Sequence, residues 1–255
     1  MPSAWWPRQE DTHCHSPRGV VSVREGRGCI FRVHMYVSKF RPAITFWDWW
    51  KQPITTPFST DTHWPKSILD TFNLCHDHNL PFGDRYYGPY NRLLNYALTD
   101  NSFTFFISPQ RLAYAEPFPP ESVYPELGLV VCNQDYNPFL FAVIKDDSWA
   151  TKPYTRLMAD AQMREQYFAY QLDYPIPPSQ LYGLSLLGTS LRVYCYDKNT
   201  DKLAPDIVDC PDANHLLPDN VLEGEWDLDI LSPDGLRKMQ EIIAYINTEV
   251  TKWYG

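Results

Sequence analysis

The sequence lacks any long apolar segment. None of its 255 residues belongs to an uncharged apolar run of the roughly 18 residues that a membrane-spanning helix needs. The first residues, MPSAWWPRQEDTHCHS, also lack the continuous apolar stretch of a secretory signal. We therefore expect an intracellular protein, cytoplasmic or nuclear, that has no membrane partner.

Paired cysteines are also missing. The six cysteines are scattered along the chain, and none forms a C-x-x-C pair. A chain of this length does not need a disulfide framework, so we expect free thiols. Histidine and cysteine cluster at residues 13–15 and 75–78, but neighbouring residues rarely face the same ion, and we interpret both clusters as chance.

Several catalytic motifs are absent as well. The sequence contains no G-x-G-x-x-G loop, no Walker loop and no G-x-S-x-G nucleophile turn. These absences exclude the common dinucleotide and phosphate loops and the usual serine hydrolase turn. The LGTS stretch that begins at Leu187 is better explained as a hairpin turn.

What the sequence does have is an uneven charge distribution. The net charge is −9, yet residues 1–45 carry seven Lys and Arg against three Asp and Glu. An acidic body opposes broad contact with phosphates, so a nucleic-acid partner would have to use a local patch. We predict a poorly ordered basic tail over residues 1–45 and a single globular domain over residues 46–255.

The apolar pattern predicts alternating helices and strands in that domain. Helical periodicity and proline at the first helical position indicate helices, whereas short apolar runs between turn residues indicate strands. The predicted helices cover residues 65–78, 90–98, 153–172 and 233–253, and the predicted strands cover residues 102–108, 127–132, 138–144, 181–188 and 191–197. Ser232 is the expected N-cap of the last helix. This order predicts an α/β (α+β) domain with a mixed central sheet flanked by helices.

A family resemblance follows from that order and from the text of the chain. Helix, strand, strand, strand, helix, strand is the core order of the PD-(D/E)XK nuclease-like superfamily. The segments YGPYNRLLNYAL, AVIKDDSW, ADAQMREQY, LYGLSLLGTSLRVYCYD and EGEWDLDILSPDG also resemble a group of uncharacterised mushroom-type fungal proteins with such a core. The resemblance implies a restriction-endonuclease-like fold with an αβββαβ core.

The resemblance also implies a metal site. The superfamily places one acid at the start of its second strand and an acid-x-lysine on its third, where they hold Mg²⁺ for phosphodiester hydrolysis. Here Glu126 stands for the first acid and Lys145 for the lysine, but Val143 occupies the second acid position. Asp147, two residues beyond the lysine, is the candidate replacement ligand, and a solvated strand end is the alternative interpretation of this acid.

The helix after the third strand supplies further candidates. Gln162 is expected to face the site, and Lys152, Arg156 and Arg164 are expected to give a small basic patch for phosphates, or simply a charged outer face. The resulting hypothesis is a nuclease-like domain with a degenerate active site. The alternative is a catalytically inactive protein-interaction module on the same fold.

Overall fold

The computed structural model describes residues 57–77, 83–98, 105–111, 127–173, 179–208 and 217–254. All of them lie in one compact unit that spans Ile44–Gly255. The predicted basic tail lies outside the described residues. No helix among the described residues has the length and apolar character needed to cross a membrane.

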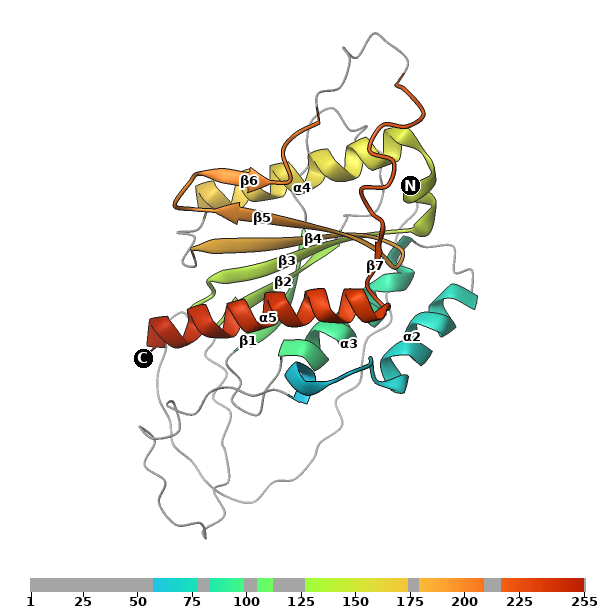
Figure 1. Ribbon diagram of the computed structural model, residues 1–255. Coiled ribbons are helices and arrows are strands. Elements are labelled where there is room, and N and C mark those ends of the chain that lie inside the picture. The colour runs from blue at the N-terminus through green and yellow to red at the C-terminus, as the bar shows by residue number, and fades with distance from the viewer. Residues whose placement is uncertain are drawn as a thin grey trace, which may run out of the picture. The chain divides into compact units, whose positions relative to one another are not determined.

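A seven-stranded sheet forms the centre of the domain (Figure 1). Six strands follow one another in the order β1-β2-β3-β4-β5-β6, and β7 also pairs with β5. The only parallel pair in this described sheet is β3 with β4, and α4 connects them. The strands are β1 Phe105–Arg111, β2 Leu127–Asn133, β3 Pro138–Lys145, β4 Gln180–Leu187, β5 Ser190–Asp197, β6 Lys202–Ala204 and β7 Leu228–Asp229.

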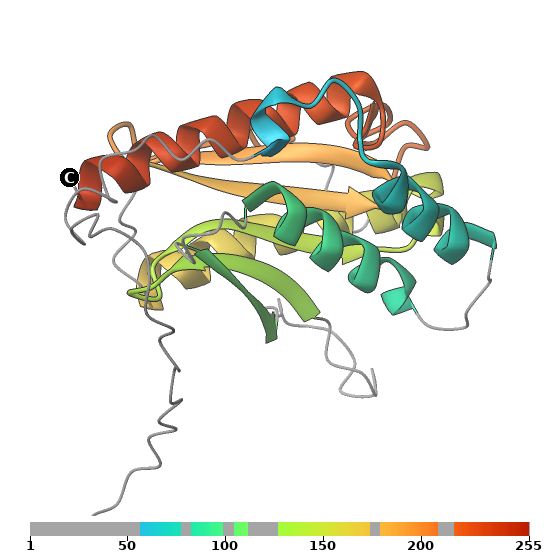
Figure 2. The ribbon, with the colours of Figure 1, turned by 90° about the horizontal axis from the view of Figure 1, so that it is seen from below.

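Helices cover both faces of the sheet. One face is covered by α4, and the other by α2, α3 and α5 (Figures 1 and 2). The α-helices are α2 Lys66–Asp77, α3 Tyr87–Leu98, α4 Pro153–Asp173 and α5 Pro233–Tyr254, and the short 3-10 helices are η1 Pro57–Thr60, η2 Gly83–Tyr86 and η3 Asp147–Thr151. Ser232 caps α5 as predicted, because its Oγ accepts a hydrogen bond from Gly235 N at 3.0 Å.

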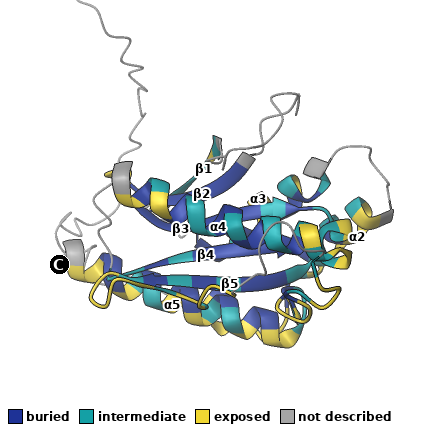
Figure 3. Cartoon of the chain, turned by 90° about the horizontal axis from the view of Figure 1, so that it is seen from above, coloured by how far each residue is buried: buried dark blue, intermediate teal, exposed yellow. Residues whose placement is uncertain are grey.

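The two faces have separate apolar cores, and the central strands between them are buried (Figure 3). On the α4 face, Phe141 packs against Met163 and Tyr167. The helix approaches the sheet closely at Gly183, where a Cβ atom would lie 2.6 Å from Met163 Cε and 2.8 Å from Tyr167 Oη. Glycine at this position therefore allows α4 to pack directly on β4.

The predicted mixed α/β architecture is confirmed, including the hairpin of β2 and β3 and the change to a helix at Pro153. The sheet is mixed, as predicted, with one parallel pair among mostly antiparallel ones. Two details differ. The first strand continues through Pro109 to Arg111, which an edge strand tolerates because it needs partners on one side only. The short strands β6 and β7 were not predicted.

Candidate functional site

Val143 occupies the position at which the family resemblance requires a second acid. Its side chain is 0 % exposed and belongs to the apolar cluster of the α4 face, together with Phe141 and Met163. In the sheet, Val143 lies between Gly128 on β2 and Ser185 on β4. The position is therefore part of the packed core.

Lys145, the candidate catalytic lysine, lies at the end of the same strand. It is 5 % exposed, and its Nζ is 4.4 Å from the centroid of the Trp149 ring. This distance allows a cation–π interaction with the first turn after the strand. The backbone carbonyl of Lys145 accepts a hydrogen bond from Gly188 N at 2.9 Å, which ties the strand end to the β4–β5 turn.

Asp147, the candidate replacement ligand, is engaged by η2. Arg85 Nη2 lies 2.6 Å from Asp147 Oδ2, and Tyr86 Oη donates to the same carboxylate at 2.9 and 3.0 Å. Arg85 also pairs with Asp146 at 2.9 Å. Burial, and next the hydrogen bond to Asp147, raise the pKa of Tyr86 above its usual range. The carboxylate thus holds η2 and α3 against the end of β3.

The other predicted acid and the helix candidate are placed differently. Glu126 lies outside the described residues. Gln162 is on α4 and is 9 % exposed, and Gln166, one turn further on, is also buried. Both glutamines therefore belong to the inner side of the helix, and the role of Gln162 in a catalytic site stays a prediction.

The three predicted phosphate-binding cations do not form one patch. Arg156 is buried and donates to the backbone carbonyls of residues 150, 219 and 221 at 2.8–2.9 Å. Arg164 pairs with Asp160 at 2.8 Å and donates to the carbonyls of residues 205 and 206. Of the three, Lys152 is the exposed one. Both arginines hold the segment between β6 and β7 against α4.

The described members of this candidate set do not by themselves fit a magnesium ion. Mg²⁺ requires oxygen ligands in near-octahedral geometry, whereas the described end of β3 offers a buried valine and an aspartate that pairs with Arg85. Among the described residues, no group of three or more His, Cys, Asp or Glu side chains could hold a metal ion. We derive no hydrolytic step through a metal at this position.

A buried charge network lies under α4, and the sequence did not reveal it. Asp160 of α4 accepts hydrogen bonds from Arg192 Nη1 at 2.8 Å and from Tyr194 Oη at 2.6 Å, both on β5. Asp160 and Arg192 are each less than 5 % exposed. Burial, and next the charge of Asp160, raise the pKa of Tyr194. With Arg164 as a third partner, the Asp160 carboxylate is fully engaged and serves to join helix and sheet.

The same network reaches the segment before β7. Arg192 Nη2 lies 3.1 Å from Glu225 Oε2, and the Arg192 guanidinium is 5.1 Å from the Trp226 ring centroid. Trp226 Nε1 donates to Ser185 Oγ at 3.1 Å. Residues 225–226 are therefore fixed on the α4 face of the sheet before the chain returns as β7.

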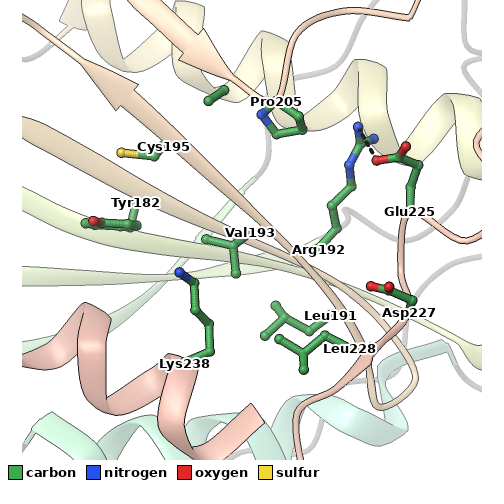
Figure 4. A pocket seen from close by; sticks show the side chains of 11 residues that line it. Tyr182, Leu191, Arg192, Val193, Cys195, Pro205, Glu225, Asp227, Leu228 and Lys238 are labelled. Carbon is green, nitrogen blue, oxygen red and sulfur yellow. Dashed lines mark ion pairs between the residues drawn. The ribbon is translucent and has the colours of Figure 1, made fainter. Parts of the chain in front are cut away.

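A pocket of about 520 Å³ opens beside this network, at the outer edge of β5 (Figure 4). Its apolar side chains are Leu191, Val193, Ala204, Pro205 and Leu228, and its polar side chains are Tyr182, Arg192, Cys195, Glu225, Asp227 and Lys238. Burial raises the pKa of Tyr182 to about 12 and also raises the pKa of Cys195. Both groups therefore line the pocket in their neutral forms at physiological pH.

We found no match between this chain and any protein-family model, curated protein or solved structure.

Proposed function

We propose that this chain is a PD-(D/E)XK nuclease-like domain that has lost metal-dependent phosphodiester hydrolysis and acts as a protein-interaction module. The burial of Val143 carries the proposal. A metal-dependent nuclease needs a carboxylate at this position, facing a wet cleft that admits phosphate and Mg²⁺. Here the position is filled by an apolar side chain under α4, next to Phe141 and Met163.

The ancestry in this proposal is supported by the order of the elements. The described residues give α3, β1, β2, β3, α4 and β4 in succession, the helix–strand–strand–strand–helix–strand order that the resemblance implies. Lys145 occupies the end of the third of these strands, where the family lysine is expected. The fold is therefore consistent with a nuclease-like ancestor whose lysine was retained and whose second acid was replaced.

The loss of hydrolysis is supported by the roles that the charged residues have taken. Lys145 packs on Trp149, and Asp147 binds Arg85 and Tyr86. Each of these contacts stabilises the strand end and reduces the capacity of the side chain to bind a metal or to activate water. The pocket at β5 offers a binding surface at a separate place in the sheet.

Calorimetric titration of the full chain with MgCl₂ and MnCl₂ tests the proposal. We expect no saturable binding that is sensitive to substitution of Lys145 or Asp147. Asp70→Asn is a suitable control, because Asp70 is exposed and lies on α2. Stoichiometric Mn²⁺ binding that is lost in Asp147→Asn and kept in Asp70→Asn would contradict the proposal.

A further inference from the structure

The outer edge of β5 is paired at its two ends and open between them. Towards its C-terminal end, Cys195 is opposite Ala204 of β6, and towards its N-terminal end, Leu191 is opposite Leu228 of β7. Both short strands are antiparallel to β5, so they run along the same line beside it. We call the opening between Ala204 and Leu228 the β5 slot. Residues 205–227, where described, leave this line and cross the α4 face.

The backbone of Val193 faces the β5 slot. In an antiparallel sheet, successive residues of a strand direct their N–H and C=O groups alternately to the two neighbouring strands. Lys198 N bonds Ser179 O on the β4 side, whereas Thr189 O accepts from Ile230 N on the β7 side. The backbone N–H and C=O groups of the odd-numbered residues of β5 therefore point away from β4, toward the outer edge of the sheet. No other described segment donates to or accepts from the Val193 backbone.

The dimensions of the β5 slot match a short extended segment. Four residue steps separate Cys195 from Leu191, which corresponds to about 13 Å at the rise of a β-strand. That length admits three extended residues between Ala204 and Leu228. The pocket that opens there has a volume of about 520 Å³, within the range of roughly 300–1,000 Å³ that is typical of ligand sites.

The chemistry of the β5 slot favours a peptide over a phosphate. A peptide backbone offers one donor and one acceptor at strand spacing, as an edge strand requires. A phosphate offers acceptors alone, and it would meet the Val193 carbonyl and the carboxylates of Glu225 and Asp227 in the same pocket. The uncharged backbone of a peptide satisfies both Val193 groups. The peptide side chain opposite Val193 would lie on the α5 face with Val193, whereas Glu225 pairs with Arg192 on the α4 face.

The side chain at the centre of such a peptide would meet Lys238. Residues directly opposite each other in antiparallel strands place their side chains on the same face. Val193 packs on the face that α5 covers, and Lys238 of α5 lines the same pocket, with its side chain extending toward Val193 (Figure 4). The Lys238 ammonium group pairs with Glu241 at 3.2 Å on the exposed side of α5. An acidic side chain opposite Val193 would therefore share this ammonium group with Glu241.

We propose that the β5 slot binds a short extended segment of a partner protein by strand addition, antiparallel to β5, with an acidic residue opposite Val193. This proposal rests on the proposed function, because it names the partner of the interaction module. It goes further by assigning the surface, the bound conformation and the preferred charge.

The test is an NMR titration of the ¹⁵N-labelled full chain with two blocked tripeptides, acetyl-Val-Glu-Val-amide and the same peptide with Lys at its centre. We expect saturable shifts of the Val193, Ala204 and Leu228 amides with the Glu peptide. The Lys peptide should bind about two- to fivefold more weakly, as an exposed ion pair implies. An absence of saturable shifts at these amides would overturn the proposal.

Two variants make the assignment specific. Val193→Pro removes the outward N–H and leaves the β4 side paired, so binding should fall at least about tenfold while the fold persists. If this variant unfolds, Lys238→Glu remains decisive: it should reverse the preference between the two peptides. Arg237→Glu makes an equal charge change at an exposed neighbour outside the pocket. This control variant should still prefer the Glu peptide over the Lys peptide. Equal behaviour of the two charge variants would contradict the proposal.

Failure here is distinguishable from failure of the proposed function. If the peptides do not bind and the chain does not cleave nucleic acid, the β5 slot is the wrong surface while the loss of hydrolysis stands. Metal-dependent cleavage by the chain would instead overturn the proposed function, whatever the peptides do.

Discussion

Arg85 and Asp147 form an ion pair of 2.6 Å that joins η2 to the end of β3. The Arg85 side chain is 8 % exposed and the Asp147 side chain 40 % exposed, so the guanidinium is shielded from water and the carboxylate remains partly solvated. Tyr86 donates to the same carboxylate. An acid that would be a metal ligand in a nuclease-like site therefore acts here as an anchor for the segment that leads into α3.

Asp147→Asn should destabilise the protein. The substitution keeps the shape of the side chain but removes one of the two carboxylates that pair with Arg85, because Asp146 stays at 2.9 Å. We expect a loss of about 1–2 kcal/mol in urea denaturation. Asp70→Asn, which breaks the exposed pair of Lys66 and Asp70, should change the free energy of unfolding by less than about 0.5 kcal/mol. Equal effects of the two variants would argue against the anchoring role.

Val143→Glu should be as damaging as Leu140→Glu. Both side chains are 0 % exposed, on opposite faces of β3. A buried carboxylate without a partner should reduce the free energy of unfolding by about 3 kcal/mol or more. Thermal melting of both variants, with and without MnCl₂, checks this expectation. A stable Val143→Glu protein that Mn²⁺ stabilised further would show that residue 143 faces a functional cleft.

Gly183→Ala should also destabilise the protein, because the new methyl group would enter the contact between β4 and α4. It would meet Phe141 at 2.9 Å as well as Met163 and Tyr167. Overpacking of this kind costs about 1–3 kcal/mol. Denaturant unfolding measures the change. Gly88→Ala is the matched control, because no atom lies within 4 Å of the added Cβ there, and alanine favours the helix.

Glu249 should contribute stability that depends on pH. Its carboxylate accepts a hydrogen bond from Lys252 at 2.7 Å and another from Ser179 Oγ at 3.2 Å. The bond from Lys252, and next that from the Ser179 backbone, lower the pKa of Glu249 against the opposing effect of burial. The pKa of Glu249 is lower in the folded protein than in the unfolded chain. Its contribution to the free energy of unfolding is therefore complete above the pKa of the unfolded chain and is lost as the pH falls through the pKa of the folded protein.

Glu249→Gln tests that dependence. The variant should be less stable than the parent protein by a constant amount at neutral pH, and the difference should shrink below about pH 4.5. Urea unfolding between pH 7 and pH 3 measures it. A difference that stayed constant to pH 3 would contradict the assigned role of the carboxylate.

The sequence predicted the elements whose signals are local. The hairpin of β2 and β3 follows from two apolar runs around Asn133 and Asn137, and α5 follows from Ser232 and Pro233. The strands β6 and β7 are too short to show a periodic pattern, and their pairing with β5 depends on residues far apart in the chain. Local patterns therefore predicted the layers of the fold and missed the broken edge at which the pocket lies.

The candidate site was harder to predict, because its character depends on what packs against it. Val143 and Lys145 share one face of β3, and the sequence alone does not tell whether that face is a cleft or a core. Its burial depends on the approach of α4, which Gly183 allows. The pairs of Asp160 with Arg192 and of Arg85 with Asp147 join residues 32 and 62 positions apart. No local spacing indicates either pair.

A cleavage assay tests the central claim most directly. Labelled single- and double-stranded DNA and RNA are incubated with the purified full chain in MgCl₂ or MnCl₂, beside Lys145→Met prepared in the same way. The proposed loss of the metal site predicts that both proteins leave the substrates intact, at the same background. Metal-dependent cleavage by the parent protein that Lys145→Met abolishes would contradict this account and establish the chain as an active nuclease.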